Sequence, residues 1–234
     1  MLSKPQLLRP SHGTSWRSRL QAFPRWPSLE AKQWVNAFAE RVCPDMNTRA
    51  LLAIGSVVRP VERVNDVDLV FLYGTIRPPY EPHPLDVDLR IYDAREVPRL
   101  ISEGHDVLSW ALRFGTVICE HDDFWSTISS QWYSRAPLPN PRVADERAVK
   151  TKRILEEVSR SGDVDAAEEL RLSLLTHEAW AFLLRKGVHP ASRAELPAQL
   201  REVGNSALAS QLVALIHKKG NSDSADNVTL ENSS

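Results

Sequence analysis

Apolar residues in the first half of the chain recur with the periods of one helix and three strands. Residues 29–42 carry apolar side chains at near-helical spacing, directly after a serine suited to cap the first turn. Residues 50–56 and 66–73 are short apolar runs with β-branched and aromatic side chains, and residues 85–92 alternate between apolar and polar. This order of elements predicts an α/β (α+β) fold with a small mixed sheet.

A stiff loop and two further helices complete the first half of the chain. Residues 74–84 contain four prolines and one glycine, which predicts a loop without regular structure. Residues 105–114 have the pattern of a helix that ends at Gly115, and residues 122–133 have that of another.

The second half of the chain is helical in character. Three prolines within residues 137–141 interrupt every periodic pattern, so we expect a domain boundary there. Four helical segments with short joints follow, at residues 145–161, 163–186, 195–203 and 206–219. They predict a small helical bundle.

The two ends of the chain differ from these domains in composition. Residues 1–27 carry five basic side chains and no acidic one, a bias that transit peptides share. We favour a basic arm that lies on the domain after it. Residues 219–234 are polar and lack aromatic side chains, which predicts a disordered tail. The predicted domains are therefore residues 28–135 and residues 143–218.

Composition places the chain among soluble globular proteins. Of its 234 residues 42% are hydrophobic and 25% charged, and the formal net charge is -1. Such a balance provides no bulk attraction to a long nucleic acid or an anionic membrane. No apolar run reaches the roughly 18 residues that a membrane-spanning helix needs. We therefore expect a cytoplasmic protein without a membrane partner.

The two cysteines are expected to be unpaired. Cys43 and Cys119 stand far apart and lack the spacing of metal ligands. Two small buried side chains in a reducing compartment are a simpler interpretation than a disulfide.

Two aspartates at the head of the predicted strand 66–73 indicate chemistry. Asp66 and Asp68 are two residues apart, so on a strand they project from the same face, about 6.6 Å apart. Like charges at the start of an apolar strand repel one another and are costly to desolvate, unless water or a bound cation compensates. Carboxylate oxygens are the ligands that Mg²⁺ prefers, especially beside the phosphates of a nucleotide.

Neighbouring residues extend this pattern. Asp88 lies on the next predicted strand and completes a set of three carboxylates, with Asp86 on the same strand face as the alternative. Gly55 and Ser56 end the strand before Asp66. Glycine lets the backbone approach a phosphate closely, and serine offers a hydroxyl and an N–H to the same anion. A phosphate site beside a cation site indicates a nucleotide.

The order of these features resembles the DNA polymerase β-type nucleotidyltransferase superfamily. That family has an apolar strand, Gly-Ser, a spacer, an Asp-x-Asp strand and a third acidic residue on a following strand. The first parts match AIGSVVRPVERVNDVDLVF, and the third matches VDLRI. The latter is similar to the VDLR form of glutamine-synthetase adenylyltransferases, which favours Asp88 over Asp86. The similarity covers about residues 50–92. The helical second half resembles only in style the partner domains of antibiotic nucleotidyltransferases.

The resemblance implies a Mg²⁺-dependent transferase that moves a nucleoside monophosphate to an acceptor hydroxyl. AMP from ATP is the expected donor, with another NTP as the alternative, and the acceptor is a small molecule or a protein. Asp66 and Asp68 would bind two Mg²⁺ ions. Asp88 would contact the ion nearer the acceptor and act as general base.

The resemblance also implies roles for the residues around the glycine. Gly55 and Ser56 would hold the triphosphate. Arg59, at a position where small bacterial members often carry an arginine, would neutralise the leaving pyrophosphate, or else be a solvent-facing turn residue. The rival interpretation of the whole chain is a catalytically silent or antitoxin-like protein of the same fold that binds a partner through its helices.

Overall fold

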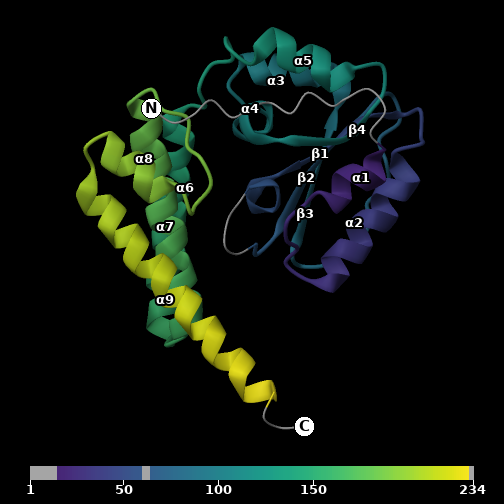
Figure 1. Cartoon of the computed structure of the whole chain (residues 1–234). Coiled ribbons are helices and arrows are strands. Elements are labelled where there is room, and N and C mark those ends of the chain that lie inside the picture. The colour runs from purple at the N-terminus through teal and green to yellow at the C-terminus, as the bar shows by residue number, and fades with distance from the viewer. Residues whose placement is uncertain (1–14, 60–63, 232–234) are drawn as a thin grey trace. The chain divides into compact units, whose positions relative to one another are not determined.

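The computed structural model describes residues 15–59 and 64–231, with side chains up to Lys218 (Figure 1). The chain divides into two compact units between Pro137 and Leu138. Each unit has a hydrophobic core of its own: two clusters of buried side chains lie in the first unit and one lies in the second.

A mixed sheet of four strands forms the centre of the first unit. The strands are β1 (Thr48–Ile54), β2 (Val67–Tyr73), β3 (Val87–Asp93) and β4 (Thr116–Glu120), in the order β3-β2-β1-β4. β1 pairs antiparallel with both β2 and β4, whereas β2 and β3 are parallel. The small mixed sheet predicted from the sequence is confirmed.

Two helices, α1 (Trp16–Gln21) and α2 (Leu29–Val42), cover one face of this sheet (Figure 1). The first turn of α2 is capped by Ser28, whose hydroxyl oxygen accepts a hydrogen bond from the amide of Ala31 at 2.9 Å. The apolar side of α2 then packs on the strands, and the ring of Phe38 meets the ring of Phe71 edge-on.

The opposite face carries α3 (Val97–Ser102), α4 (Asp106–Phe114) and α5 (Phe124–Trp132) (Figure 1). Their buried side chains pack against residues of β1 and β2 that alternate with those of the first face. Helices on both sides explain why β1 is buried almost throughout. The helix expected over residues 105–114 ends before Gly115 as predicted.

Short elements such as β4 and α3 were not predicted from the sequence. β4 has five residues, with Thr116 and Glu120 at its ends, and α3 is a six-residue helix with Pro98 in its first turn. Elements of this length have little intrinsic stability and form because neighbouring elements pack on them. Their sequences therefore carry too few positions to show a period.

The expectation of unpaired cysteines is wrong, because Cys43 and Cys119 form a disulfide. Cys43 directly follows α2, Cys119 lies in β4, and their Cα atoms are 5.8 Å apart. The two positions are separated by 76 residues in the sequence, so only the packing of α2 on the sheet brings them together. The cysteines give no support to the expected reducing compartment.

The described part of the basic arm belongs to the first unit. Leu20 and Phe23 are buried in the core beneath α1 and α2. The guanidinium of Arg19 donates to the backbone oxygens of Val117 and Ile118 in β4, at 3.3 and 3.4 Å. Residues 1–14 of the predicted arm lie outside the described residues.

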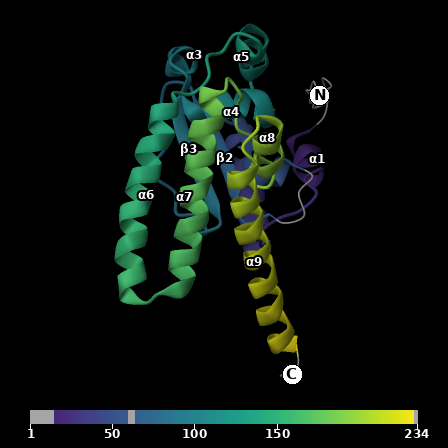
Figure 2. The ribbon, with the colours of Figure 1, turned by 90° about the vertical axis from the view of Figure 1, so that its left-hand side faces the viewer.

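In the second unit, the described residues form the helices α6 (Pro141–Ser161), α7 (Val164–Arg185), α8 (Leu196–Glu202) and α9 (Ser206–Glu231). α6 and α7 run side by side in opposite directions (Figure 2). Their joint contains Gly162, which has a φ of +84° and ends α6. Leucines from α7, α8 and α9 make the core of this unit.

The helix α9 extends further than the sequence predicts. It continues to Glu231, whereas a disordered tail was expected from residue 219 onward. Adding residues to an existing helix fixes one residue per hydrogen bond and needs no new nucleus, so a polar segment can prolong an apolar one. No helix in the described residues is long and apolar enough to cross a membrane.

Candidate functional site

The parallel pairing of β2 with β3 places two of the predicted aspartates side by side. Asp68 lies directly across from Asp88 in the register of the two strands. Paired residues of neighbouring strands project from the same face of a sheet, so both carboxylates lie on the face that α3, α4 and α5 cover further along the strands. Asp66, exposed, precedes β2 by one residue.

The neighbouring charges influence the pKa of Asp68. The pKa of Asp68 is raised from its usual 3.8 to about 7, chiefly because the side chain is buried and further because Asp66 and Asp88 carry negative charges nearby. The positive charge of Arg90 opposes this shift but does not cancel it. The negative charges of Asp66 and Asp88 therefore both act on the carboxyl of Asp68.

The predicted glycine corner borders this group. Gly55 follows β1 and has a φ of +79°, and a β-carbon built on it would lie 2.3 Å from Oδ2 of Asp68. Only a glycine allows this close approach of backbone and carboxylate. The hydroxyl of Ser56 lies 3.5 Å from the backbone oxygen of Asp66. This long contact joins the turn after β1 to the residue before β2.

Asp88 is bound by an arginine that is absent from the predicted site residues. Arg90 donates from Nη2 at 2.5 Å and from Nε at 3.1 Å, and both nitrogens contact the same oxygen, Oδ2. Burial works against the guanidinium charge. The hydrogen bond and charge of Asp88, together with the charge of Asp68, outweigh burial and raise the pKa of Arg90. One signal was present in the sequence: Arg90 follows Asp88 by two residues and so shares its strand face.

Asp86, the alternative third carboxylate, has a different role. Its Oδ2 accepts a hydrogen bond from the hydroxyl of Ser28 at 2.5 Å, and its backbone oxygen accepts one from the amide of Val67 at 2.8 Å. Asp86 thus links the start of α2 to the start of β2. Between the two alternatives, Asp88 is the one that lies across from Asp68.

Arg59 lies at the end of the turn that follows Gly55 and is half-buried. Its guanidinium carbon is 5.0 Å from the centroid of the Phe114 ring, at the end of α4. An arginine over an aromatic face is held by the attraction of its charge to the ring. This position differs from that of a simple solvent-facing turn residue, which was one of the two expectations.

The three aspartates do not form a ready-made metal centre. Among the residues that the structure describes, no group of three or more histidine, cysteine, aspartate or glutamate side chains is arranged to hold a metal ion. Oδ2 of Asp88 has a cationic partner of its own, the guanidinium of Arg90.

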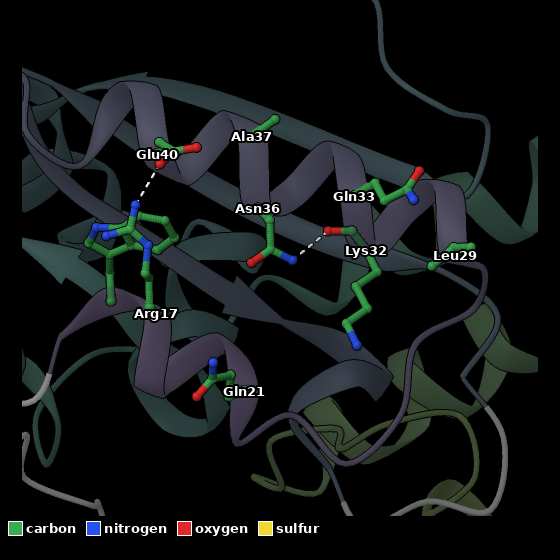
Figure 3. Close-up of a pocket in the computed structure, with 9 residues that line it drawn as sticks. Arg17, Gln21, Leu29, Lys32, Gln33, Asn36, Ala37 and Glu40 are labelled. Atoms are coloured by element: carbon green, nitrogen blue, oxygen red, sulfur yellow. Dashed lines mark hydrogen bonds and ion pairs between the residues drawn. The ribbon is translucent and has the colours of Figure 1, made fainter.

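A separate groove lies between α1 and α2 (Figure 3). An ion pair between Arg17 and Glu40 spans it, and the amide of Asn36 donates to the backbone oxygen of Lys32 at 2.7 Å (Figure 3). None of the predicted site residues lines this groove, whose walls are formed by Trp16, Arg17, Gln21, Leu29, Lys32, Gln33, Asn36, Ala37 and Glu40.

Comparisons with known proteins give little guidance. No protein-family model matches the chain, and no curated protein matches it. A solved structure with some similarity is a nucleotidyltransferase-like protein from Exiguobacterium sibiricum, at 16% sequence identity and a TM-score of 0.34. The match covers 79% of this chain and 73% of that chain. At so low a TM-score, the chemistry of the carboxylates rests on their own geometry.

Proposed function

We propose that this chain is a Mg²⁺-dependent nucleotidyltransferase that moves AMP from ATP to the hydroxyl of a small molecule or a protein. The observation that carries the proposal is the pairing of Asp68 with Asp88 beside the backbone of Gly55. Burial and two neighbouring negative charges make the ionised form of Asp68 unfavourable. Carboxyl groups with strongly shifted pKa values are typical of functional sites.

The chemistry of these donors fits a hard divalent cation. All three side chains offer carboxylate oxygens, and the raised pKa of Asp68 reflects burial and a repulsion that a bound cation relieves. Asp66, Asp68 and Asp88 would hold the ions. When bound, Mg²⁺ would stabilise the charge on the attacking and leaving oxygens.

The residues of the chain then have distinct tasks. Asp88, on the half-buried edge strand β3, would accept the proton of the acceptor hydroxyl as general base. Gly55 and Ser56 would bind the triphosphate, because the glycine leaves room for an anion and the serine supplies a hydroxyl. Arg59, in the same turn, would neutralise the pyrophosphate as it leaves.

The test is calorimetric titration of ATP with and without Mg²⁺ into the full chain and into Asp66→Asn plus Asp68→Asn. We expect metal-dependent ATP affinity in the wild type and its loss in the double variant. Asp122→Asn plus Asp123→Asn is a matched control, since it removes two exposed carboxylates from the same unit, and asparagine accepts their positive φ angles. Labelled ATP incubated with acceptor panels and cell lysate then identifies the acceptor.

A second candidate is a catalytically silent protein that binds a partner. The ion pair between Arg90 and Asp88 favours it, because one of the three carboxylates is engaged without a metal. Absent nucleotide affinity in the wild type, or affinity that the double variant retains, supports this candidate and contradicts the enzyme.

A further inference from the structure

The edge strand β3 carries backbone groups on its outer side that can bind a further strand. The amide of Val67 donates to the backbone oxygen of Asp86 at 2.8 Å, and this bond begins the parallel ladder between β2 and β3. Even-numbered residues of β3 therefore direct their N–H and C=O groups toward β2, and odd-numbered residues direct theirs away from it. Within the part of the chain that the structure describes, no hydrogen bond reaches the backbone of Leu89 or Ile91 from that outer side.

The opposite edge of the sheet, at β4, is covered. The guanidinium of Arg19 donates to the backbone oxygens of Val117 and Ile118, and α1 lies beside the same strand. Proteins commonly cover or charge their edge strands, because unpaired backbone groups associate with other chains. The contrast between the two edges identifies β3 as the one that can receive a partner strand.

The side chains of β3 divide between an apolar and a charged face. Leu89 and Ile91 pack against the core beneath α2. Asp88 and Arg90 share the other face, with 46% and 41% of their side chains accessible to solvent. Both contacts from Arg90 use Oδ2 of Asp88, and Oδ1 accepts no hydrogen bond from the described residues. A negative and a positive side chain thus stand two residues apart along an open edge.

This spacing of charges is complementary to itself. A two-fold axis perpendicular to the sheet makes two β3 strands antiparallel and pairs outward-directed residues with one another. With the axis at Leu89, Asp88 of each copy lies opposite Arg90 of the other. An axis at residue 88 places two aspartates opposite each other, and an axis at residue 90 places two arginines so, which is destabilising. The charges therefore select one register.

We propose that two copies of this chain associate through β3 in this register and form one continuous sheet. On the apolar face, Leu89 lies beside Leu89 of the other copy, and Ile91 lies beside Val87 of the other copy. On the charged face, Arg90 of each copy donates to Oδ1 of Asp88 in the other. Because Asp88 lies across from Asp68, each copy contributes an arginine to the group of carboxylates in the other.

The association is independent of the proposed function, since it needs neither a nucleotide nor a metal. The experiment is sedimentation velocity of the full chain over a wide range of protein concentration. We expect a species of twice 26.4 kDa that becomes dominant as the concentration rises. D88R and R90E each place like charges opposite one another and are expected to raise the dissociation constant at least about tenfold.

Mixing these two variants tests the register itself. In an equimolar mixture of D88R with R90E, opposite charges face each other at both positions of a mixed pair. The mixture is therefore expected to associate about as tightly as the wild type. Failure of the mixture to associate, with both variants folded by their thermal unfolding curves, overturns the proposal.

Two further variants control for loss of charge and for loss of fold. R95E reverses an exposed arginine that pairs with Asp93 at the end of β3, beyond the proposed charge pairs, and is expected to leave the association unchanged. D88R plus R90D exchanges the two charges and keeps their pair within the chain. Energy transfer between labelled chains is expected to show that this variant associates with itself and not with the wild type. Free exchange of its chains with the wild type overturns the proposal.

Amide hydrogen exchange locates the contact on the strand. Exchange at Leu89 and Ile91 is expected to slow on association, whereas Val87 is an internal control because its amide already donates to the backbone oxygen of Pro84 at 3.1 Å. A wild type that is monomeric at every concentration, or a dimer that D88R and R90E leave intact, overturns this inference. Either result leaves the ATP titration of the proposed function unaffected.

Discussion

Gly55 and Asp68 approach each other so closely that the site depends on the absence of a side chain. A β-carbon on Gly55 would lie 2.3 Å from Oδ2 of Asp68, and the φ of Gly55 is +79°. Gly55→Ala is therefore expected to destabilise the first unit, because it adds a steric clash to a backbone conformation that alanine avoids. The loss in the free energy of unfolding is expected to be about 2 to 4 kcal/mol, measured by urea denaturation.

Gly187→Ala is the matched control for this substitution. Gly187 has a similar φ of +75°, and a β-carbon there would meet nothing within 4 Å. Its replacement measures the conformational cost alone, on the order of 1 kcal/mol. A loss for Gly55→Ala no larger than that for Gly187→Ala would show that the approach of Gly55 to Asp68 is not tight.

The carboxyl of Asp68 makes the stability of the metal-free protein depend on pH. Its pKa is 3.8 in the usual case and about 7 in the folded protein. At a pH between 3.8 and about 7, Asp68 is protonated in the folded protein and ionised in the unfolded chain. The contribution of Asp68 to stability is thus fully present below pH 3.8 and is lost as the pH rises to about 7.

Asp68→Asn removes this dependence, because the amide carries no charge at any of these pH values. Relative to the wild type, the variant is expected to gain a few kcal/mol of stability at pH 8 and much less at pH 4.5. The measurement is thermal unfolding in chelator across this range. An equal difference between the two proteins at both pH values would contradict the raised pKa of Asp68.

Much of the central sheet was predictable because its residues repeat with a clear period. β2 is a nearly continuous run of apolar residues, and β3 alternates between apolar and polar ones. β1 ends at Ile54, directly before Gly55. A strand pattern also determines which residues share a face, which grouped Asp66 with Asp68 and left Asp86 and Asp88 as alternatives for the third carboxylate. The choice of Asp88 came from the resemblance of VDLRI to a known family form, and not from spacing.

What escaped prediction depends on contacts between distant segments. Cys43 and Cys119 meet only because α2 packs on the sheet, and no spacing rule contains that information. The hydrogen bond of Asp86 to Ser28 likewise joins two elements far apart in the sequence. Arg90 is a different case. The strand pattern places it on the same face as Asp88, but only the folded structure shows that its guanidinium donates to Asp88.

Asp86 and Asp88 are expected to respond differently to the same chemical change. Asp88→Asn removes a carboxylate that lies across from Asp68, so under the proposed function it abolishes nucleotidyl transfer and weakens Mn²⁺ binding. Asp86→Asn keeps an oxygen for the Ser28 hydroxyl and is expected to cost only about 1 kcal/mol of stability while leaving the metal affinity intact.

Calorimetric titration of Mn²⁺ and urea denaturation of the two variants make this comparison. Reversal of the pattern, with Asp86→Asn losing metal affinity and Asp88→Asn keeping it, would assign the third carboxylate to Asp86.

The disulfide closes a chain segment that contains every predicted site residue. Cys43 and Cys119 are separated by 76 residues, and the segment between them carries β1, β2 and β3. Closing a loop of this length lowers the entropy of the unfolded chain and stabilises the folded one by about 4 kcal/mol. Cys43→Ala plus Cys119→Ala is therefore expected to unfold at lower urea concentration, with the loss confined to the first unit.

The comparison uses the oxidised wild type, the reduced wild type and the double variant, with amide hydrogen exchange to locate the change. Because the ring acts on the unfolded chain, the reduced wild type and the double variant are expected to lose similar amounts. The second unit has no cysteine and serves as the internal control. Equal stability of the oxidised and reduced proteins would show that packing alone holds α2 on β4 and that the covalent link adds nothing to it.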